Sequence, residues 1–529
     1  MEQLKVKSFA FCLITVLALL LGGCSNQFNE PDDNNRVYYE IFIRSFADSN
    51  GDKIGDLKGA TEQIKYVSDL GASGIWLMPI MPSDSYHKYD VKDYMAIDPE
   101  YGTVDDFKAF VSKCHKSGIR VIIDMPFNHT SSSHPWFSSA CDYLRSLPAG
   151  ASIDSTKCKY ADYYFFTDTQ VNGSYYNVEG TPFYYEGVFE SGMPDLNLFN
   201  PSVIEEIHSI CDFWLDLDID GFRMDAVSHY SENDPETNKQ VISDIYKYCL
   251  AKNPDFYMVS EVWEAEPVIA DYYGSGTPSV FNFDLAGPEG KIMKAANGKF
   301  SAQKLVEAMK TYECDFCEGN PEYIDATFVA NHDMGRIANA LSSDAAAMKF
   351  AGGLNMIMRG NPFIYYGEEI GMKSKGNKDE NKRLPMQWKN SSPFMCDNPP
   401  GADTGIEQSF DCAEDQIEDS DSIYSYYKNA IAIRRNNPAI ARGLTEDIAY
   451  LNDGDVAVFK RSFKKETNLI IINTGAECMV SLSDIDMDKY GIDLNSQKIV
   501  GTMKVNQSDE VTFDDGRFKL PAKSIVILK

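Results

Sequence analysis

The chain of 529 residues is 43% hydrophobic and 12% aromatic, which is enough apolar material for two or three folded domains and excludes general disorder. Its formal net charge of −30 repels nucleic-acid phosphates and anionic lipid, so we expect no nucleic-acid partner. A neutral or cationic partner is compatible with this charge. We expect the protein to act as a monomer.

The first 24 residues are typical of an export signal. Basic residues precede an apolar run at 9–21 that is too short to span a membrane, and Cys24 follows two glycines. The Leu-Gly-Gly-Cys sequence resembles the bacterial lipobox, which implies lipidation of Cys24; an ordinary signal peptide cut nearby is the alternative. Residues 25–35 are polar and predict a tether. We therefore expect an exported protein at the bacterial cell surface or outer membrane, attached through its lipid anchor alone.

Strand-like and helix-like runs alternate over residues 36–435. The helix-like runs are amphipathic, and several strand-like runs are apolar on both faces, as buried parallel strands are. Eight strands that alternate with helices predict an α/β fold, a (β/α)8 TIM barrel, with a doubly wound open sheet as the alternative. The predicted strands are 37–46, 74–80, 121–128, 221–227, 256–263, 279–285, 326–333 and 361–369.

Two regions fall outside this alternation. The long connection at 129–198 predicts a small domain inserted after the third strand, because a loop of this length must be structured. Its aromatic residues at 175–176 and 183–185 are either sugar-stacking platforms or the core of the insert. Short β-like runs at 436–529 predict a C-terminal β-sandwich. Candidate disulfide pairs in loop-like sequence are Cys141 with Cys158 and Cys396 with Cys412.

Polar side chains gather at the C-terminal ends of the predicted strands, where TIM barrels carry their active sites. The third strand ends in DMPFNH (124–129) and the fourth reads GFRMDAVSH (221–229). The fifth ends in SEVW (260–263) and the seventh in FVANHD (328–333). Each polar residue alone could be a structural cap on its strand. Together they place more charge at one mouth than the stability of a barrel requires.

These four motifs, with MPDLN at 193–197, resemble the short motifs of the α-amylase family, family 13 of the glycoside hydrolases, in order and with family-like spacing. The resemblance runs along the whole chain from about residue 37 and implies a retaining mechanism. Such a mechanism needs a nucleophilic carboxylate and a protonated carboxyl roughly 5–5.5 Å apart. By this resemblance Asp225 is the nucleophile, Glu261 the acid/base, and Asp333 the third carboxylate, which binds sugar hydroxyls.

The resemblance also implies a set of substrate-binding residues. Arg223 precedes Asp225 by two residues on the same strand face, within reach to keep that carboxylate ionised. Two histidines match residues that hydrogen-bond the sugar at the cleavage site, and Tyr89 matches a tyrosine that stacks under it. Arg383 resembles an arginine near the same subsite, although an exposed surface position fits it equally well. The implied substrate-binding residues are His87, Tyr89, His129, Arg223, His332 and Arg383.

Two cation sites are predicted. Segment 48–56 places oxygen ligands at alternate positions, with glycines that permit a tight turn, which is typical of a calcium loop; magnesium and a solvated acidic turn are the alternatives. The resemblance implies a second calcium between the barrel and the insert. We expect one or two structural calcium ions that take no part in the chemistry. The predicted ligands are Asp48, Asn50, Asp52, Ile54 and Asp56 in the loop, and Asn128, Asp195 and the backbone carbonyl of His229 at the second site.

Three functions are compatible with these residues. The first is an endo-acting α-amylase on the α-1,4-glucosidic bonds of starch, glycogen and maltooligosaccharides, because Ala226 after the predicted nucleophile resembles α-1,4-specific members. The second is a neopullulanase-like enzyme or an α-glucosidase with mixed α-1,4 and α-1,6 activity. The third is an inactive glycan-binding surface lipoprotein, which predicts the loss of a catalytic carboxylate. All three carboxylates are present, so we expect a hydrolase of α-glucan.

Overall fold

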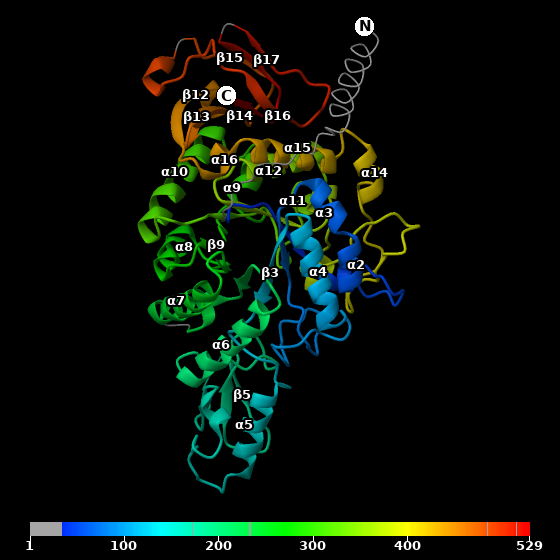
Figure 1. Ribbon diagram of the computed structural model, residues 1–529, viewed down its shortest axis with the longest axis vertical. Helices are drawn as coiled ribbons and strands as arrows, with labels where there is room; N and C mark the ends of the chain where they lie inside the picture. Colours follow the sequence, from blue (N-terminus) through cyan, green and yellow to red (C-terminus); the bar gives the residue numbers. More distant parts are fainter. Residues whose placement is uncertain (1–33, 172, 232–233, 484, 515) are drawn as a thin grey trace, which may run out of the picture. The chain divides into compact units, whose positions relative to one another are not determined.

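Figure 1 shows the computed structural model of the chain, which describes residues 34–529 except 172, 232–233, 484 and 515. The predicted signal peptide with Cys24, and the tether up to residue 33, lie outside the described residues. Asn34 already contacts the barrel, because its carbonyl oxygen accepts a hydrogen bond of 2.8 Å from the Asn361 side chain. In the part of the chain that the structure describes, no helix combines the length and the apolarity needed to cross a membrane.

The eight predicted strands form one parallel sheet that closes into a barrel. A parallel bridge between Phe281 and Ala326 joins the two ends of the sheet, which confirms the (β/α)8 barrel and excludes the open sheet. Each strand ends before its predicted end, so Asp225, Glu261 and Asp333 lie on the loops that follow, whereas Asp124 and Arg223 remain within β3 and β7. In sheet order the strands are β10 (Ala326–Thr327), β11 (Asn361–Tyr365), β1 (Tyr38–Ile41), β2 (Gly74–Leu77), β3 (Arg120–Met125), β7 (Gly221–Met224), β8 (Tyr257–Ser260) and β9 (Ser279–Val280).

Aromatic side chains fill the interior of the barrel. Tyr38 is fully buried, and its ring stacks on Tyr257 and Phe363 with centroid distances of 5.3 and 4.8 Å. Side chains alternate along a strand, so Glu40 shares the inward face of β1 with Tyr38, whereas Tyr39 faces the surrounding helices. A buried carboxylate thus lies inside the barrel, where it needs a partner.

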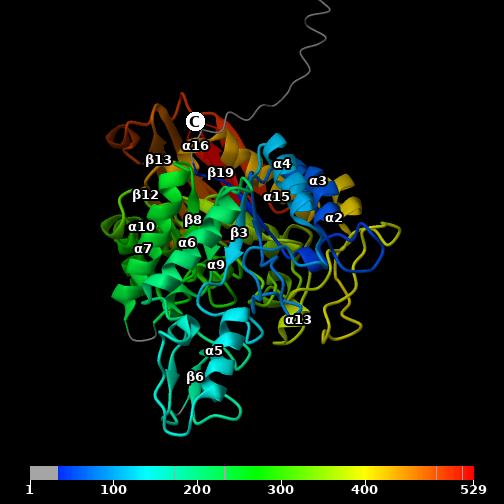
Figure 2. The same ribbon diagram turned by 60° about the horizontal axis from the view of Figure 1, so that its bottom comes forward.

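Amphipathic helices surround the barrel (Figure 2). Helix α4 buries one apolar face, and a capping box between Thr103 and Asp106 fixes its start. Helices α6 and α7 each begin with a proline behind an Asn200 or Asp234 cap, a combination that favours a sharp start. The helices of the outer layer are α2 (Leu57–Glu62), α3 (Ile64–Leu70), α4 (Val104–Lys116), α6 (Pro201–Leu215), α7 (Pro235–Lys252), α8 (Glu266–Tyr272), α9 (Lys291–Ala296), α10 (Ala302–Gly319), α11 (Ile337–Ala340), α12 (Ala345–Met356), α13 (Asp379–Lys382), α14 (Ala413–Glu418) and α15 (Ile423–Asn436).

The insert after β3 combines one helix with a small antiparallel sheet. Helix α5 (Pro135–Ser146) packs on strands β4 (Phe166–Thr167), β6 (Tyr184–Glu186) and β5 (Tyr175–Asn177). Phe137 of α5 contacts Tyr164 and Tyr185 at centroid distances of 5.0 and 4.8 Å. Phe183 and Tyr185 are buried and therefore belong to the core of the insert rather than to exposed sugar-stacking platforms.

The C-terminal region forms two antiparallel sheets. The chain first makes a short helix, α16 (Pro438–Arg442), so the first strand begins at Glu446 rather than directly after residue 435. Buried apolar side chains such as Val458, Ile471 and Phe518 fill the space between the sheets. One sheet comprises β12 (Glu446–Leu451), β13 (Val456–Phe463), β14 (Glu466–Asn473), β19 (Ser524–Leu528) and β16 (Ile499–Lys504), and the other β15 (Cys478–Ser481), β18 (Arg517–Leu520) and β17 (Thr512–Asp514).

Neither candidate disulfide forms. Each of the ten described cysteines is a free thiol, including both members of the two candidate pairs. Cys141 is buried on α5, whereas Cys158 donates to the Ser139 carbonyl oxygen at 3.8 Å. Cys412 instead donates to the Asp415 carboxylate next to it on the chain, at 3.1 Å. Loop-like sequence therefore did not identify thiols that face each other.

Candidate active site

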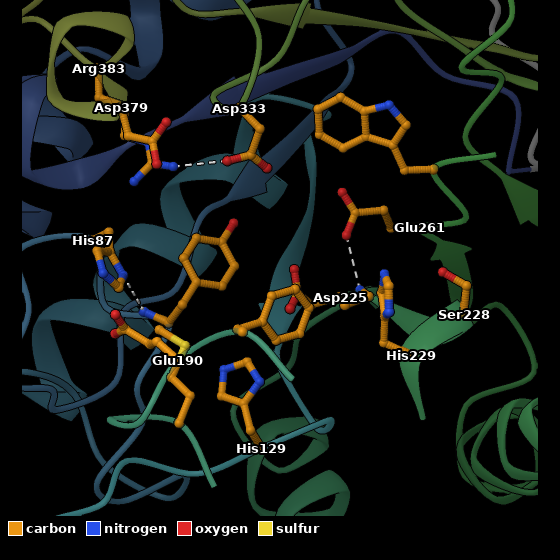
Figure 3. A pocket seen from close by; sticks show the side chains of 15 residues that line it. His87, His129, Glu190, Asp225, Ser228, His229, Glu261, Asp333, Asp379 and Arg383 are labelled. Atoms are coloured by element: carbon orange, nitrogen blue, oxygen red, sulfur yellow. Dashed lines mark hydrogen bonds and ion pairs between the residues drawn. The ribbon is translucent and has the colours of Figure 1, made fainter. Parts of the chain in front are cut away.

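A pocket of about 500 Å³ opens at the C-terminal end of the barrel strands. Figure 3 shows Asp225, Glu261 and Asp333 pointing toward one shared space, with His87 and His129 along the same wall. The carboxylates come from the loops after β7, β8 and β10, which meet at this end because the strands are parallel. The structure thus brings together the three residues that the sequence predicted to be catalytic.

One guanidinium holds the carboxylates at the base of the pocket. Arg223 is fully buried, and its Nη1 donates to both oxygens of Asp124, at 2.8 and 3.0 Å, and to Asp225 Oδ1 at 2.5 Å. Its Nη2 lies 2.8 Å from Glu261 Oε1. The planar fork of arginine can serve several carboxylates at once, which a point-charge ammonium cannot. Asp225 and Glu261 are therefore held against the same cation.

Burial and the shared guanidinium act in opposite directions on the pKa of the two carboxyls. Burial raises the pKa of Glu261 to about 7, although Arg223 lowers it and the Ala226 N–H donates to its Oε2 at 2.9 Å. Burial also raises the pKa of Asp225, which Arg223 opposes through the shorter contact. Near neutral pH, Glu261 can therefore hold a proton, while the contact with Arg223 favours the ionised form of Asp225. This is the division of roles that an acid and a nucleophile need.

The third carboxylate lies in a network of cations. Asp333 Oδ1 accepts from Arg383 Nη2 at 2.8 Å, and its Oδ2 lies 3.0 Å from His332 Nε2. Burial would raise the pKa of Asp333, but the charges of His332 and Arg383 hold it well below its ordinary range. Arg383 is buried rather than on the surface, and it also donates to the His332 carbonyl oxygen at 3.2 Å. Asp333 therefore stays ionised and can only accept hydrogen bonds.

Tyr89 and His87 reach the pocket from the loop after β2. The Tyr89 hydroxyl donates to Asp124 at 3.1 Å and lies 2.6 Å from His332 Nε2. The Tyr89 backbone N–H donates to His87 Nδ1 at 3.2 Å. His129, at the end of the DMPFNH motif, is buried with no hydrogen-bond partner on its Nε2, and burial lowers its pKa to about 4. A neutral imidazole is thus available at the pocket wall.

Sequence reasoning missed several pocket residues. Trp263 and Phe189 line the pocket with 51% and 45% of their surfaces exposed, and Trp263 stacks on Phe283 at 5.0 Å. Trp263 ends the SEVW motif, so its position was a usable signal. Phe189 lies on an insert loop with no periodic pattern to mark it. The other residues of this kind are Glu190, Met193, Ser228 and Asp379.

In the predicted cation loop at 48–56, side-chain oxygens accept hydrogen bonds from the backbone of the loop itself. Both Asp48 carboxylate oxygens accept backbone N–H groups of the loop, at 2.7 to 2.9 Å. The side-chain oxygens of Asn50 and Asp52 each accept the N–H two residues on. Asp56 instead caps helix α2 through the Gly59 N–H. Carboxylate and amide oxygens are the ligands that calcium prefers. Among the described residues, however, no three His, Cys, Asp or Glu side chains form a metal-binding group.

The second predicted cation site joins the end of β3 to the insert. The Asn128 side chain donates to Asp195 Oδ1 at 3.1 Å, and Asp195 Oδ2 accepts the Val188 N–H at 3.0 Å. A bridge between His129 and Asp195 pairs the two segments. His229 lines the neighbouring pocket. Asn128 and Asp195 thus place oxygens of the type that calcium prefers between the end of β3 and the insert.

Known proteins resemble this chain along most of its length. The family model "Alpha amylase, catalytic domain" matches residues 40–443. Alpha-amylase 3 of Dictyoglomus thermophilum is 38% identical over 477 residues, which cover 88% of this chain and 89% of that protein. A 4-alpha-glucanotransferase of Thermotoga maritima is 30% identical over 432 residues, covering 78% and 89%. The solved structure of Eubacterium rectale Amy13B matches with a TM-score of 0.89 and 42% identity, covering 94% and 96%.

Proposed function

Because the chain belongs to the α-amylase family of glycoside hydrolases, we propose that it is a retaining, endo-acting enzyme that hydrolyses the α-1,4-glucosidic bonds of starch, glycogen and maltooligosaccharides. The observation that carries this proposal is the arrangement of Asp225 and Glu261 on one buried guanidinium at the base of an open pocket. An ionised carboxylate beside a carboxyl with a pKa of about 7 is the pair that retention requires.

The reaction proceeds in two displacements. Asp225 attacks the anomeric carbon while Glu261 gives its proton to the glycosidic oxygen, so that the leaving glucan departs and a glycosyl ester forms on Asp225. Glu261, now ionised, takes a proton from water, which attacks the same carbon and releases Asp225. Arg223 keeps Asp225 ionised in the free enzyme, and the buried setting of Glu261 keeps its proton available.

The remaining pocket residues hold the sugar at the cleavage site. Asp333 accepts hydrogen bonds from sugar hydroxyls, and His332 and Arg383 fix its carboxylate. Tyr89 offers its ring to the apolar face of the sugar, because its hydroxyl is tied to Asp124. His129 has a free buried Nε2 for a hydroxyl group. These contacts strengthen as the sugar ring at the cleavage site flattens, which favours the transition state.

Endo action is supported by the open pocket and its exposed aromatic side chains. Phe189 comes from the insert and Trp263 from the loop after β8, so glucan has apolar surfaces to stack on from two different elements. The glucanotransferase and α-amylase relatives both act, by their names, on α-glucan. We further propose a monomer with structural calcium at the two described loops, exported and lipid-anchored through Cys24. The ion would stabilise these loops and take no part in the chemistry.

Substitution and product analysis test this function. Asp225→Asn and Glu261→Gln keep the size of each side chain, and we expect starch hydrolysis to fall by several orders of magnitude with the fold intact. Activity above one tenth of wild type in either variant would contradict the assignment. On amylose, iodine colour should fade before reducing sugar accumulates, with maltose to maltotetraose released as α-anomers. Glucose as the sole early product indicates an α-glucosidase, and rapid panose release from pullulan a neopullulanase-like enzyme.

A further inference from the structure

Glu40 is a carboxylate inside the barrel that the proposed mechanism does not use. It lies on β1 on the same inward face as Tyr38, and only 1% of its surface is exposed. An ionised carboxylate at such a place is costly unless a cation or hydrogen-bond donor accompanies it. His332 meets this need, because its Nδ1 lies 2.6 Å from Glu40 Oε1 and its ring is fully buried. The pair links the first barrel strand to the loop that carries Asp333.

The second ring nitrogen of His332 also faces hydrogen-bond acceptors. The Tyr89 hydroxyl, which donates to Asp124, lies 2.6 Å from His332 Nε2, and its oxygen can accept from that nitrogen. Asp333 Oδ2 lies 3.0 Å from the same nitrogen, and an ionised carboxylate has no proton to give. Both ring nitrogens therefore need a proton, one for Glu40 and one shared by Tyr89 and Asp333. Only the imidazolium form of His332 supplies both.

We propose that Glu40 is a positioning residue, whose carboxylate keeps His332 as a doubly protonated imidazolium and aims its Nε2–H at Asp333. This inference rests on the proposed function, in which Asp333 and His332 bind the sugar at the cleavage site. Without the charge of Glu40, His332 loses its second proton more readily, and an Nε2 lone pair then faces the Asp333 carboxylate. That repulsion moves Asp333 away from the position in which it accepts sugar hydroxyls.

The charges around His332 agree with this role. Burial alone would lower the pKa of His332, but the carboxylates of Asp333 and Glu40 raise it to about 10. The two acidic partners therefore outweigh the effect of burial on His332. The charged and titratable groups around His332 come from several elements. They are Glu40 on β1, Tyr89 after β2, Asp124 on β3, Arg223 on β7, Asp225 after β7, Asp333 after β10, and Arg383 directly after α13.

The protonation of His332 can be measured directly on the full chain. The protein has seven histidines, so labelling with ¹⁵N-histidine gives few ring signals, and a His332→Gln sample assigns the signal of interest. At pH 8 we expect both nitrogens of His332 to be protonated. A neutral His332 at this pH overturns the proposal, whatever the variants do. This measurement needs no substrate, so its outcome is separate from that of the proposed function.

Glu40→Gln tests whether the charge of Glu40 keeps His332 doubly protonated, because glutamine keeps the size and one acceptor oxygen but removes the charge. We expect the pKa of His332 to fall by about 1 to 3 pH units, which is the usual effect of a neighbouring opposite charge. Glu40→Asp keeps the charge and should restore most of the wild-type value. The matched control is Glu369→Gln, a buried glutamate that accepts from Tyr39 and Tyr66 and touches no histidine. It should leave the His332 titration unchanged.

Kinetics then separate positioning from a structural role. We expect kcat/KM of Glu40→Gln, divided by that of wild type, to fall about tenfold between pH 6 and pH 9, because His332 becomes neutral only in the variant over this range. A variant that is merely misfolded loses activity by a factor that does not depend on pH, and that result would overturn the proposal. If wild type fails to cleave α-glucan while His332 titrates as expected, the proposed function fails and the structural pairing stands.

Discussion

At the residue scale, the chemistry depends on how buried charges are partnered. Arg223 contacts three carboxyl groups, and its charge favours the ionised form of each. Burial works in the opposite direction, and it raises the pKa of both Asp124 and Glu261 to about 7. Two carboxyl groups that share one cation titrate as a coupled pair, so a measured pKa belongs to the pair.

The pH dependence of hydrolysis follows from these charges. Glu261 must carry a proton to assist the leaving group, and its pKa is raised to about 7. As pH rises through this value the proton is lost, so we expect kcat/KM to fall steadily above about pH 7. The profile is measured on a soluble maltooligosaccharide from pH 4 to 10. A constant kcat/KM up to pH 10 would show that Glu261 is not the acid.

The grouping of the three proposed catalytic carboxylates could be predicted from the sequence, because each of them lies in a short motif after a predicted strand. Asp225, Glu261 and Asp333 follow apolar strand runs, and parallel strands of a barrel end at one mouth, so the three carboxylates were expected to lie together. Glu40 was missed, because a single carboxylate in an apolar strand finds its partner only once the barrel has closed. The contact joins residues 40 and 332, which no local pattern relates.

At the element scale, the loop after β2 carries an unusual residue between two pocket residues. Lys88 has a left-handed backbone with φ of 69°, which costs about 1–2 kcal/mol for a residue other than glycine. Its ammonium is buried and contacts Asp98 and Glu100 at 2.8 and 2.7 Å. The ion pairs offset the backbone cost and hold His87 and Tyr89 on either side.

Substitution of Lys88 separates these two effects. Lys88→Met removes the charge and keeps the backbone cost, leaving Asp98 buried and unpaired, so we expect a loss of about 3 kcal/mol in the free energy of unfolding and a raised KM. Lys88→Gly also loses the charge but fits the left-handed backbone, and should be the more stable of the two by about 1 kcal/mol. Unfolding in urea measures both.

The control for Lys88 is an ion pair in the same loop. Lys92 contacts Asp84 at 2.7 Å, and the two side chains are 37% and 56% exposed, whereas that of Lys88 is only 4% exposed. Lys92→Met should therefore change stability by less than about 1 kcal/mol and leave KM unchanged. Equal losses for Lys88→Met and Lys92→Met would refute a clamping role for Lys88.

The cation loop at 48–56 is a second element with a testable role. An ion bound only by the native state stabilises it by mass action, so we expect a chelator to lower the melting temperature and added calcium to restore it. Asp48→Asn and Asp52→Asn should each reduce this sensitivity, because each removes a charged oxygen donor. An unchanged melting temperature in excess chelator, with no metal detected by elemental analysis, would exclude both predicted sites.

The sequence predicted the barrel strands more accurately than it predicted contacts between side chains. All eight barrel strands lie inside or beside the predicted runs, because long apolar segments that alternate with amphipathic helices have few other ways to bury themselves. The aromatic residues of the insert left two alternatives open, and the packing of Phe137 on Tyr185 decided for a core. The disulfide pairs were wrong, because sequence says nothing about which thiols face each other.

At the scale of the whole molecule, the larger C-terminal sheet buries both of its faces, one against the smaller sheet and one against the barrel helices. Alternate residues of β13 and β14 point in opposite directions, so Val458 and Ile471 fill the space between the two sheets, whereas Phe459 and Ile472 join the core of the barrel helices. The larger sheet thus shares a continuous apolar core with the barrel. We infer that the two parts unfold together.

Arg461 gives the test of this coupling. It lies on β13 and is fully buried, and its Nη1 donates to the carbonyl oxygens of Ile357 and Ile440 at 2.6 and 2.7 Å, beyond the barrel helix α12 and on α16. Arg461→Met removes the donor to these carbonyls and the cation 3.6 Å from the buried Glu313 carboxylate, so we expect a lower melting temperature with a single calorimetric transition. Lys465→Met, in the exposed turn after the same strand, should have little effect. Two separate transitions in wild type, with only one shifted by Arg461→Met, would show that the sheet and the barrel unfold independently.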